Sequence, residues 1–153
     1  LYRYATVDAN RLFDNLGDVD ATRRAVEAFA RSFIESMPTG KQNTFANRTL
    51  PEAIVVMVRD SFPVNLAGAF EVPVVAAGGQ SRVERATAAL VARAQEVSTD
   101  LGQDPVAVWA IGIGEAKSAL GEGAASLGWE RSTLPALPAA LGELVKNRLA
   151  DQG

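Results

Sequence analysis

The stretch Ala53-Ile54-Val55-Val56-Met57-Val58 decides the fold class, because a short run of apolar, mostly β-branched residues predicts a buried strand. Upstream, apolar residues at helical spacing predict a helix over residues 18–37. Downstream, Ser81-x-x-Glu84 has the spacing of a capping box and predicts the start of a second helix. The apolar stretch 105–114 predicts another strand.

The remaining segments complete a mixed order of elements. Residues 1–7 alternate aromatic and β-branched residues with others, which predicts a strand, and residues 138–150 predict a last helix. Between residues 115 and 128, glycine and alanine leave a loose helix and a loop as equal alternatives. Strands and helices mix without regular βαβ alternation, which indicates an α+β fold with one sheet covered by helices.

Composition limits the possible chemistry. A chain of 153 residues that is 48% hydrophobic can bury one ordinary core, so we expect a single domain over residues 1–153. It contains no histidine and no cysteine, which excludes disulfides, Cys/His zinc sites and Ser-His-Asp or Cys-His catalysis within this chain. No apolar run is long enough to cross a bilayer, so we expect no membrane partner. The absence of cysteine agrees with a cytoplasmic protein.

A polar loop follows the first predicted helix. Residues 38–48 contain two cations, Lys41 and Arg48, and no acid, which suits an anionic partner. Gln42 and Asn43 add hydrogen-bond donors for phosphate and sugar, and Phe45 could stack on a base. The alternative is a solvated loop in which Phe45 fills the core. A net charge of −3 argues against a protein coated with nucleic acid, but leaves room for a local groove.

Two apparent nucleotide motifs fail. Gly40-Lys41 lacks the earlier glycine and the following Ser or Thr of a phosphate-binding loop, since those positions hold Glu35 and Gln42. The segment 112–114 begins like a dinucleotide fingerprint, but Lys117 stands where the third glycine is required. Arg23 and Arg24 are predicted to lie on a solvated helix face.

The chain contains four blocks in this order: Tyr2-Arg3-Tyr4-Ala5, Asn15-Leu16-Gly17, Pro38-x-Gly40-Lys41-Gln42-x-x-Phe45-Ala46 and Asn65-Leu66-Ala67-x-Ala69-Phe70-Glu71. Together they resemble the C-terminal part of the CasC family, the repeated backbone subunit of the type I-E CRISPR surveillance complex called Cascade. The resemblance is clear over residues 1–75.

The resemblance implies a modified RNA-recognition-motif (ferredoxin-like) palm with an antiparallel sheet. It further implies that the chain is a C-terminal fragment lacking the N-terminal part of the palm and the thumb. Family members polymerise as a helical filament along CRISPR RNA, contact other Cascade subunits, and meet target DNA through the RNA. The implied role is a non-catalytic RNA-binding scaffold with no cofactor and no metal.

By the same resemblance, the polar loop is the RNA-binding site. Lys41 is expected to be the main phosphate contact, Arg48 a weaker one, and the role of Phe45 stays open between stacking and core. Residues 72–75, Val-Pro-Val-Val, replace the cations expected after Phe70-Glu71, which argues against a second RNA contact there. The expected RNA-binding residues are Gly40, Lys41, Gln42, Asn43, Phe45 and Arg48.

Two other functions compete with the scaffold. One is a CRISPR RNA processing ribonuclease of the related ferredoxin-like group, which commonly relies on histidine and is therefore disfavoured here. The other is a protein-interaction domain without a nucleic-acid role. The small-residue segment 65–70 is expected to pack, either between palms or between a strand and a helix.

Overall fold

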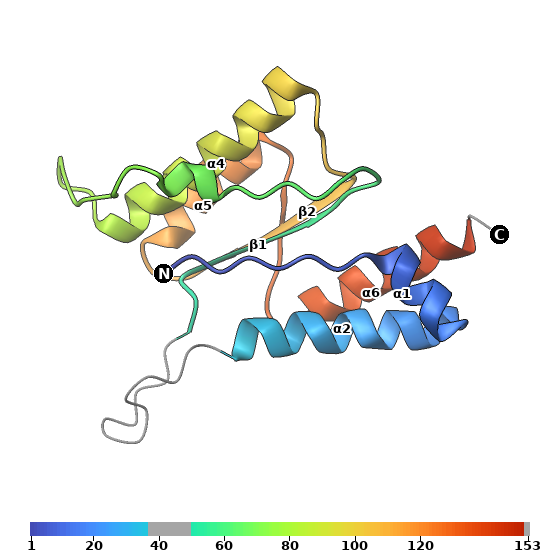
Figure 1. Ribbon diagram of the computed structural model, residues 1–153. Coiled ribbons are helices and arrows are strands. Elements are labelled where there is room, and N and C mark those ends of the chain that lie inside the picture. Colours follow the sequence, from blue (N-terminus) through green and yellow to red (C-terminus); the bar gives the residue numbers. More distant parts are fainter. Residues whose placement is uncertain (37–49, 152–153) are drawn as a thin grey trace. The chain divides into compact units, whose positions relative to one another are not determined.

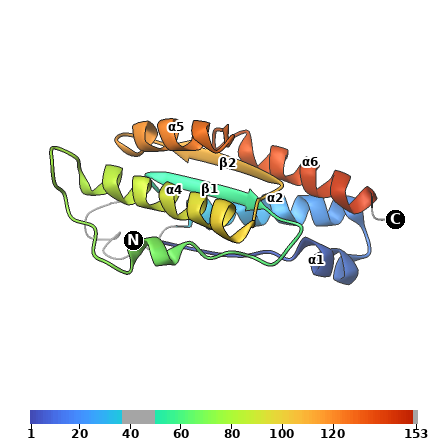
Figure 2. The same ribbon diagram turned by 90° about the horizontal axis from the view of Figure 1, so that it is seen from above.

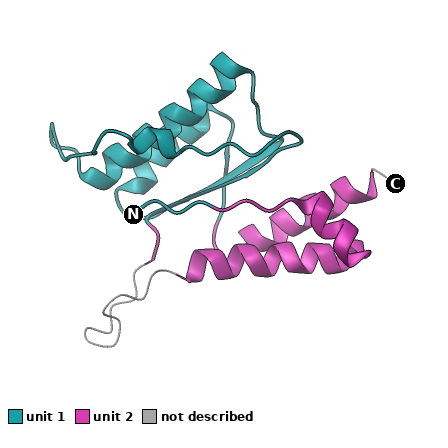
Figure 3. Ribbon diagram, viewed as in Figure 1, with its two compact units in different colours: residues 1–4, 52–132 teal, residues 5–51, 133–153 magenta. Residues whose placement is uncertain are grey.

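The computed structural model describes residues 1–36 and 50–151, and the chain divides into two compact units (Figure 3). Unit 1 consists of Leu1–Tyr4 and Glu52–Ser132, and unit 2 of Ala5–Pro51 and Thr133–Gly153. Each unit is therefore built from two separate pieces of the sequence. The single domain expected from the sequence stays a prediction.

Unit 1 contains the sheet. Strand β1 (Ala53–Val58) pairs antiparallel with β2 (Ala107–Gly112), in a register that runs from Ala53 opposite Gly112 to Val58 opposite Ala107. The short β3 (Glu130–Arg131) joins the other side of β2 in parallel, so the strand order is β1-β2-β3. The predicted strands at 53–58 and 105–114 and the predicted α+β class are confirmed, and the long strand pair is antiparallel as expected.

Two helices, α4 (Arg82–Leu101) and α5 (Ala116–Ser126), pack on one face of this sheet (Figures 1 and 2). Alternate residues of the two strands point to that face because side chains alternate along a strand. The undecided segment 115–128 is thus largely helical. The buried cluster consists of Leu66, Val91, Ala94, Val97, Val108, Ala110, Leu120, Ala124 and Trp129.

Helix α4 has well-formed ends. The Ser81 hydroxyl accepts a hydrogen bond from the Glu84 backbone N–H at 3.1 Å, which confirms the predicted start. The Glu84 carboxylate accepts from Gln80 Nε2 at 3.1 Å. Gly102 ends the helix in the left-handed region (φ 61°), where glycine carries no Cβ penalty.

Unit 2 is helical. Helix α2 (Val19–Glu35) and helix α6 (Leu137–Ala150) pack side by side, and α1 (Ala9–Leu16) packs on α2 (Figure 2). The helices predicted at 18–37 and 138–150 are confirmed, with α2 ending at Glu35. The predicted stop residues Pro38 and Gly40 lie outside the described residues. Helix α1 was not predicted.

The predicted strand at residues 1–7 is wrong. These residues precede α1 and belong to no strand in the described chain, because none of the three described strands pairs with them. In the segment 62–75, a 3-10 helix, η1 (Ala67–Phe70), packs on α4. A Cβ at Gly68 would make only an ordinary contact, 3.5 Å from Arg93 Nε.

Candidate nucleic-acid interface

The six residues expected to bind RNA, Gly40, Lys41, Gln42, Asn43, Phe45 and Arg48, lie outside the described residues. The structure describes the two segments between which they stand in the sequence. One is the end of α2, in unit 2, and the other is the start of β1, in unit 1. The site therefore stays a prediction.

The last turns of α2 lead into the predicted loop. Phe29 and Phe33 stack on one another with ring centroids 5.8 Å apart and planes 16° apart, and Phe29 is 42% exposed. Arg31 and Glu35 form an exposed ion pair at 3.9 Å. Ser36 closes the helix by donating its backbone N–H to the Ser32 carbonyl at 2.9 Å. The exposed part of the Phe29 ring is an aromatic surface of the kind on which a base can stack.

The start of β1 lies beside the turn between β2 and α5. The Ile113 backbone N–H donates to the Glu52 carbonyl at 2.9 Å, and the Lys117 N–H donates to the Gly114 carbonyl at 3.2 Å. Gly114 adopts φ 52°, so glycine is favoured there for backbone reasons. The segment 112–114 thus ends a strand and begins a turn, consistent with the failed fingerprint.

Lys117 is a candidate that the sequence analysis missed. It is exposed in the first turn of α5. The turn that precedes α5 is hydrogen-bonded to Glu52, which lies just before β1 and follows the predicted loop in the sequence. Glu52 and Glu115 are also exposed nearby in the chain, so the local charge is mixed. The sequence signal for Lys117 is a lysine just after a glycine-containing turn. This pattern is too common to identify an RNA contact by itself.

Two of the four sequence blocks meet in unit 1. The Tyr2 hydroxyl donates to Asn65 Oδ1 at 3.4 Å, across 63 positions of sequence. The Tyr2 ring also lies against Phe70, and burial raises the pKa of the Tyr2 phenol. Asn65 Oδ1 in turn accepts from the Ala67 backbone N–H at 2.9 Å, and Leu66 is buried in the core. These two blocks pack within unit 1, where a 3-10 helix and not the expected strand lies on α4. Packing between palms stays a prediction.

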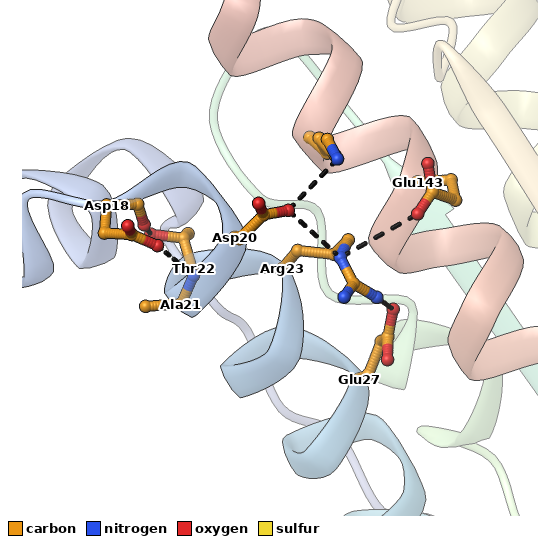
Figure 4. Close-up of polar contacts among 8 residues, drawn as sticks. Asp18, Asp20, Ala21, Thr22, Arg23, Glu27 and Glu143 are labelled. Carbon is orange, nitrogen blue, oxygen red and sulfur yellow. Dashed lines mark hydrogen bonds and ion pairs between the residues drawn. The ribbon is translucent and has the colours of Figure 1, made fainter.

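A network of charges joins α2 to α6 within unit 2 (Figure 4). Lys146 Nζ lies 3.0 Å from Asp20 Oδ1. Arg23 Nη1 lies 2.6 Å from Glu27 Oε1, and Arg23 Nε lies 3.8 Å from Glu143 Oε1. Arg23 is half-buried and paired, so the prediction that it lies on a solvated face is wrong, whereas Arg24 is exposed.

These charges neutralise each other and leave little capacity for an external anion. The hydrogen bond and charge of Lys146 hold the pKa of the Asp20 carboxyl below its usual value, with a smaller contribution from Arg23. Acids around Arg23, Glu27 first, raise the pKa of that guanidinium. The network therefore joins two helices, and we do not assign RNA binding to it.

Within residues 1–36 and 50–151, no group of three or more Asp, Glu, His or Cys side chains is placed to hold a metal ion. None of the described helices is long and apolar enough to cross a membrane.

Comparisons with known proteins give a family and two similar structures. Residues 1–139 match the model of a family described as CT1975-like protein. A chain of a solved "CRISPR RNA-guided surveillance complex" is 31% identical with a TM-score of 0.74, over 90% of this chain and 50% of that chain. A chain of a "CRISPR RNA-guided surveillance complex, pre-nicking" is 30% identical with a TM-score of 0.71, over 91% of this chain and 36% of that chain. No curated protein sequence matches.

Proposed function

Because this chain belongs to the CT1975-like protein family, we propose that it serves as a subunit of a CRISPR RNA-guided surveillance complex. One observation carries the proposal. Over 90% of its length, the chain is similar in fold and 31% identical in sequence to a chain of such a complex. This chain spans half the length of that relative.

The role within the complex is that of a non-catalytic scaffold for CRISPR RNA of the type I-E kind. Copies of the protein line up along the RNA as a helical filament in the cytoplasm and contact other Cascade subunits. Target DNA is met through the RNA, because base pairing reads sequence while protein holds shape and backbone. The lack of histidine in the chain is consistent with this role, since the competing ribonucleases commonly use that residue.

The RNA contact is assigned to the polar loop. Lys41 and Arg48 supply charge for phosphates, and Gln42 and Asn43 supply donors for phosphate and sugar. Gly40 allows the backbone to approach closely, and Phe45 stacks on a base or fills the core. Cations along an RNA backbone gain affinity by releasing counterions, and that gain depends on salt.

The test is salt-dependent binding of labelled CRISPR RNA to the full-length protein, comparing wild type with Lys41→Ala. Loss of one phosphate contact should weaken binding and make the slope of log K against log salt shallower by about 0.7 for a single strand. Lys146→Gln is the matched control, because its ammonium is paired with Asp20 and is not assigned to RNA.

Identical curves for wild type and Lys41→Ala would remove Lys41 from the interface. An equal loss in Lys146→Gln would attribute the effect to net charge rather than to the loop. RNA cleavage by the purified protein would overturn the non-catalytic role.

A further inference from the structure

The ring of Phe29 is a flat apolar surface that the described part of the chain leaves open. Phe29 lies on α2 and is 42% exposed. Phe33, one turn later, stacks on it with ring centroids 5.8 Å apart and planes 16° apart. The stacked neighbour limits the orientations of the Phe29 ring, while exposed surface remains on that ring. Helix α2 therefore presents an aromatic side chain that is both oriented and accessible.

The helix neighbours of Phe29 do not add charge to this surface. Residues three and four positions away lie on the same face of a helix. At Phe29 these residues are Ala25, Val26, Ser32 and Phe33. None of them is a carboxylate that would repel the phosphates of a nucleic-acid strand. This face of α2 can therefore lie beside an RNA backbone without an electrostatic penalty from its own residues.

Phe29 is also close along the chain to the proposed RNA contact. Helix α2 ends at Glu35, six residues after Phe29, which corresponds to about 9 Å along the helix axis at about 1.5 Å per residue. The predicted polar loop begins three residues later in the sequence, at Pro38. An RNA strand held by that loop needs to extend only a short way along α2 to bring a base to the ring.

We propose that Phe29 is a base-stacking residue of the RNA interface. The inference rests on the proposed function and extends the RNA contact from the polar loop to a described helix. Proteins that bind single strands use aromatic side chains as platforms on which bases stack, and this stacking tolerates any base. Stacking therefore suits a scaffold that holds the shape and backbone of the RNA and leaves its sequence to base pairing.

An apolar protein partner fits this face less well. Protein-binding surfaces are contiguous apolar patches with several large side chains. Apart from the stacked Phe33, the exposed same-face neighbours of Phe29 are small, as Ala25 and Ser32 illustrate. One exposed ring is enough for one base, because every base has a π-face. The size of the exposed surface thus favours a base over a protein side.

The first test crosslinks the full-length protein to CRISPR RNA that carries 5-iodouridine at single positions. Irradiation joins an iodouridine base to an aromatic side chain that stacks on it, and trypsin then separates the candidate residues. Cleavage after Arg24 and Arg31 leaves Phe29 as the only aromatic residue of peptide 25–31. Phe33 and Phe45 fall in the separate peptides 32–41 and 42–48. We expect RNA-linked peptide 25–31 from at least one labelled position.

The second test measures the affinity of unlabelled CRISPR RNA for variants of the full-length protein. Phe29→Ala should weaken binding by about 5- to 150-fold, the range for the loss of one base stack. The salt slope should stay unchanged, because no phosphate contact is removed. Phe29→Tyr keeps an aromatic face and should bind like the wild type. Phe29→Leu keeps apolar packing on Phe33 and should still lose most of the affinity that stacking supplies.

Phe62→Ala is the matched control, because Phe62 is 65% exposed and lies in unit 1, after β1. It should bind RNA like the wild type, and an equal loss in Phe62→Ala would overturn the assignment to Phe29. If Phe29→Ala fails to fold, Phe29→Leu and the crosslinks of the wild-type protein decide.

Two results would overturn this inference and leave the proposed function in place. One is unchanged affinity in Phe29→Ala while the wild-type protein binds RNA. The other is crosslinking confined to peptides other than 25–31. Failure of the wild-type protein to bind CRISPR RNA would instead overturn the proposed function itself, and this inference with it.

Discussion

The rings of Tyr2 and Phe70 lie 5.1 Å apart, with their planes inclined by 49°, and connect the first residues of unit 1 to the 3-10 helix on α4. A tilted aromatic pair of this kind stabilises a fold by about 0.5–1.5 kcal/mol beyond the burial of area. The hydroxyl contributes less, because its 3.4 Å bond to Asn65 is long and exposed.

Tyr2→Ala should therefore lower the free energy of unfolding by at least about 0.5–1.5 kcal/mol, whereas Tyr2→Phe should change it by less than about 0.5 kcal/mol. Urea unfolding of the two variants and the wild type measures both effects. If Tyr2→Ala left the free energy of unfolding unchanged, the ring pair would contribute nothing to stability.

The glycines of α5 offer a contrast of close neighbours. A Cβ at Gly121 would meet nothing within 4 Å, whereas a Cβ at Gly123 would overlap the Val91 side chain of α4. Gly121→Ala should raise the free energy of unfolding by about 0.5–1 kcal/mol, because alanine favours the helix and reduces the entropy of the unfolded chain. Gly123→Ala should lower the free energy of unfolding by about 1–3 kcal/mol, because the added methyl group overpacks the contact with α4. Thermal unfolding measures the melting temperature of each variant. Equal changes in melting temperature for the two variants would contradict close packing of α5 on α4.

The Asp20–Lys146 pair predicts a pH effect. The pKa of Asp20 in the folded protein lies below its value in the unfolded chain, which is about 3.9. The pair therefore stabilises the fold fully above the unfolded pKa. The stabilisation is lost as pH falls through the folded pKa. Lys146→Gln should raise the Asp20 pKa and flatten this acid-side loss. A carboxyl titration followed by NMR gives the pKa, and an unchanged value would rule out Lys146 as its main cause.

The Trp109–Glu130 contact connects β2 to β3. Trp109 is 6% exposed, and its Nε1–H donates to Glu130 Oε2 at 3.1 Å. Glu130→Ala leaves a largely buried tryptophan without this acceptor and should cost about 1–3 kcal/mol. Glu130→Gln retains an acceptor and should cost less. Unfolding curves rank the two variants, and the reverse order would mean that the charge matters more than the hydrogen bond.

Lys117 tests whether the RNA surface extends beyond the polar loop. Its exposed position near the start of β1 predicts that Lys117→Ala weakens RNA binding less than Lys41→Ala does, also with a shallower salt slope. Filter binding at several salt concentrations separates the two variants. An unchanged slope in Lys117→Ala would confine the contact to the loop.

Local patterns were sufficient for several elements. Ser81 and Glu84 predicted the start of α4, and the β-branched run predicted β1, because capping chemistry and strand preference act over a few residues. Helix α1, which was not predicted, also has a local signal at each end. The Asp8 side chain accepts from the Arg11 N–H at 2.9 Å, and Gly17 ends the helix at φ 64°.

Other features depend on distant residues and left no local signal. Residues 1–7 alternate as a strand would, yet strand identity requires a ladder partner, and the described strands provide none. The two-residue strand β3 is too short to show a period. The predicted loop with Lys41 lies outside the described residues, and its RNA contact stays a prediction.

The sequence by itself determined the α+β class, most element types, the absence of histidine and cysteine chemistry, and the resemblance that pointed to a CRISPR family. Tertiary structure alone decided which groups meet: Tyr2 with Phe70, and Lys146 with Asp20. The physical reason is range. Propensity and capping act between neighbours in the chain, whereas burial and pairing depend on partners that the fold brings together from tens of residues away.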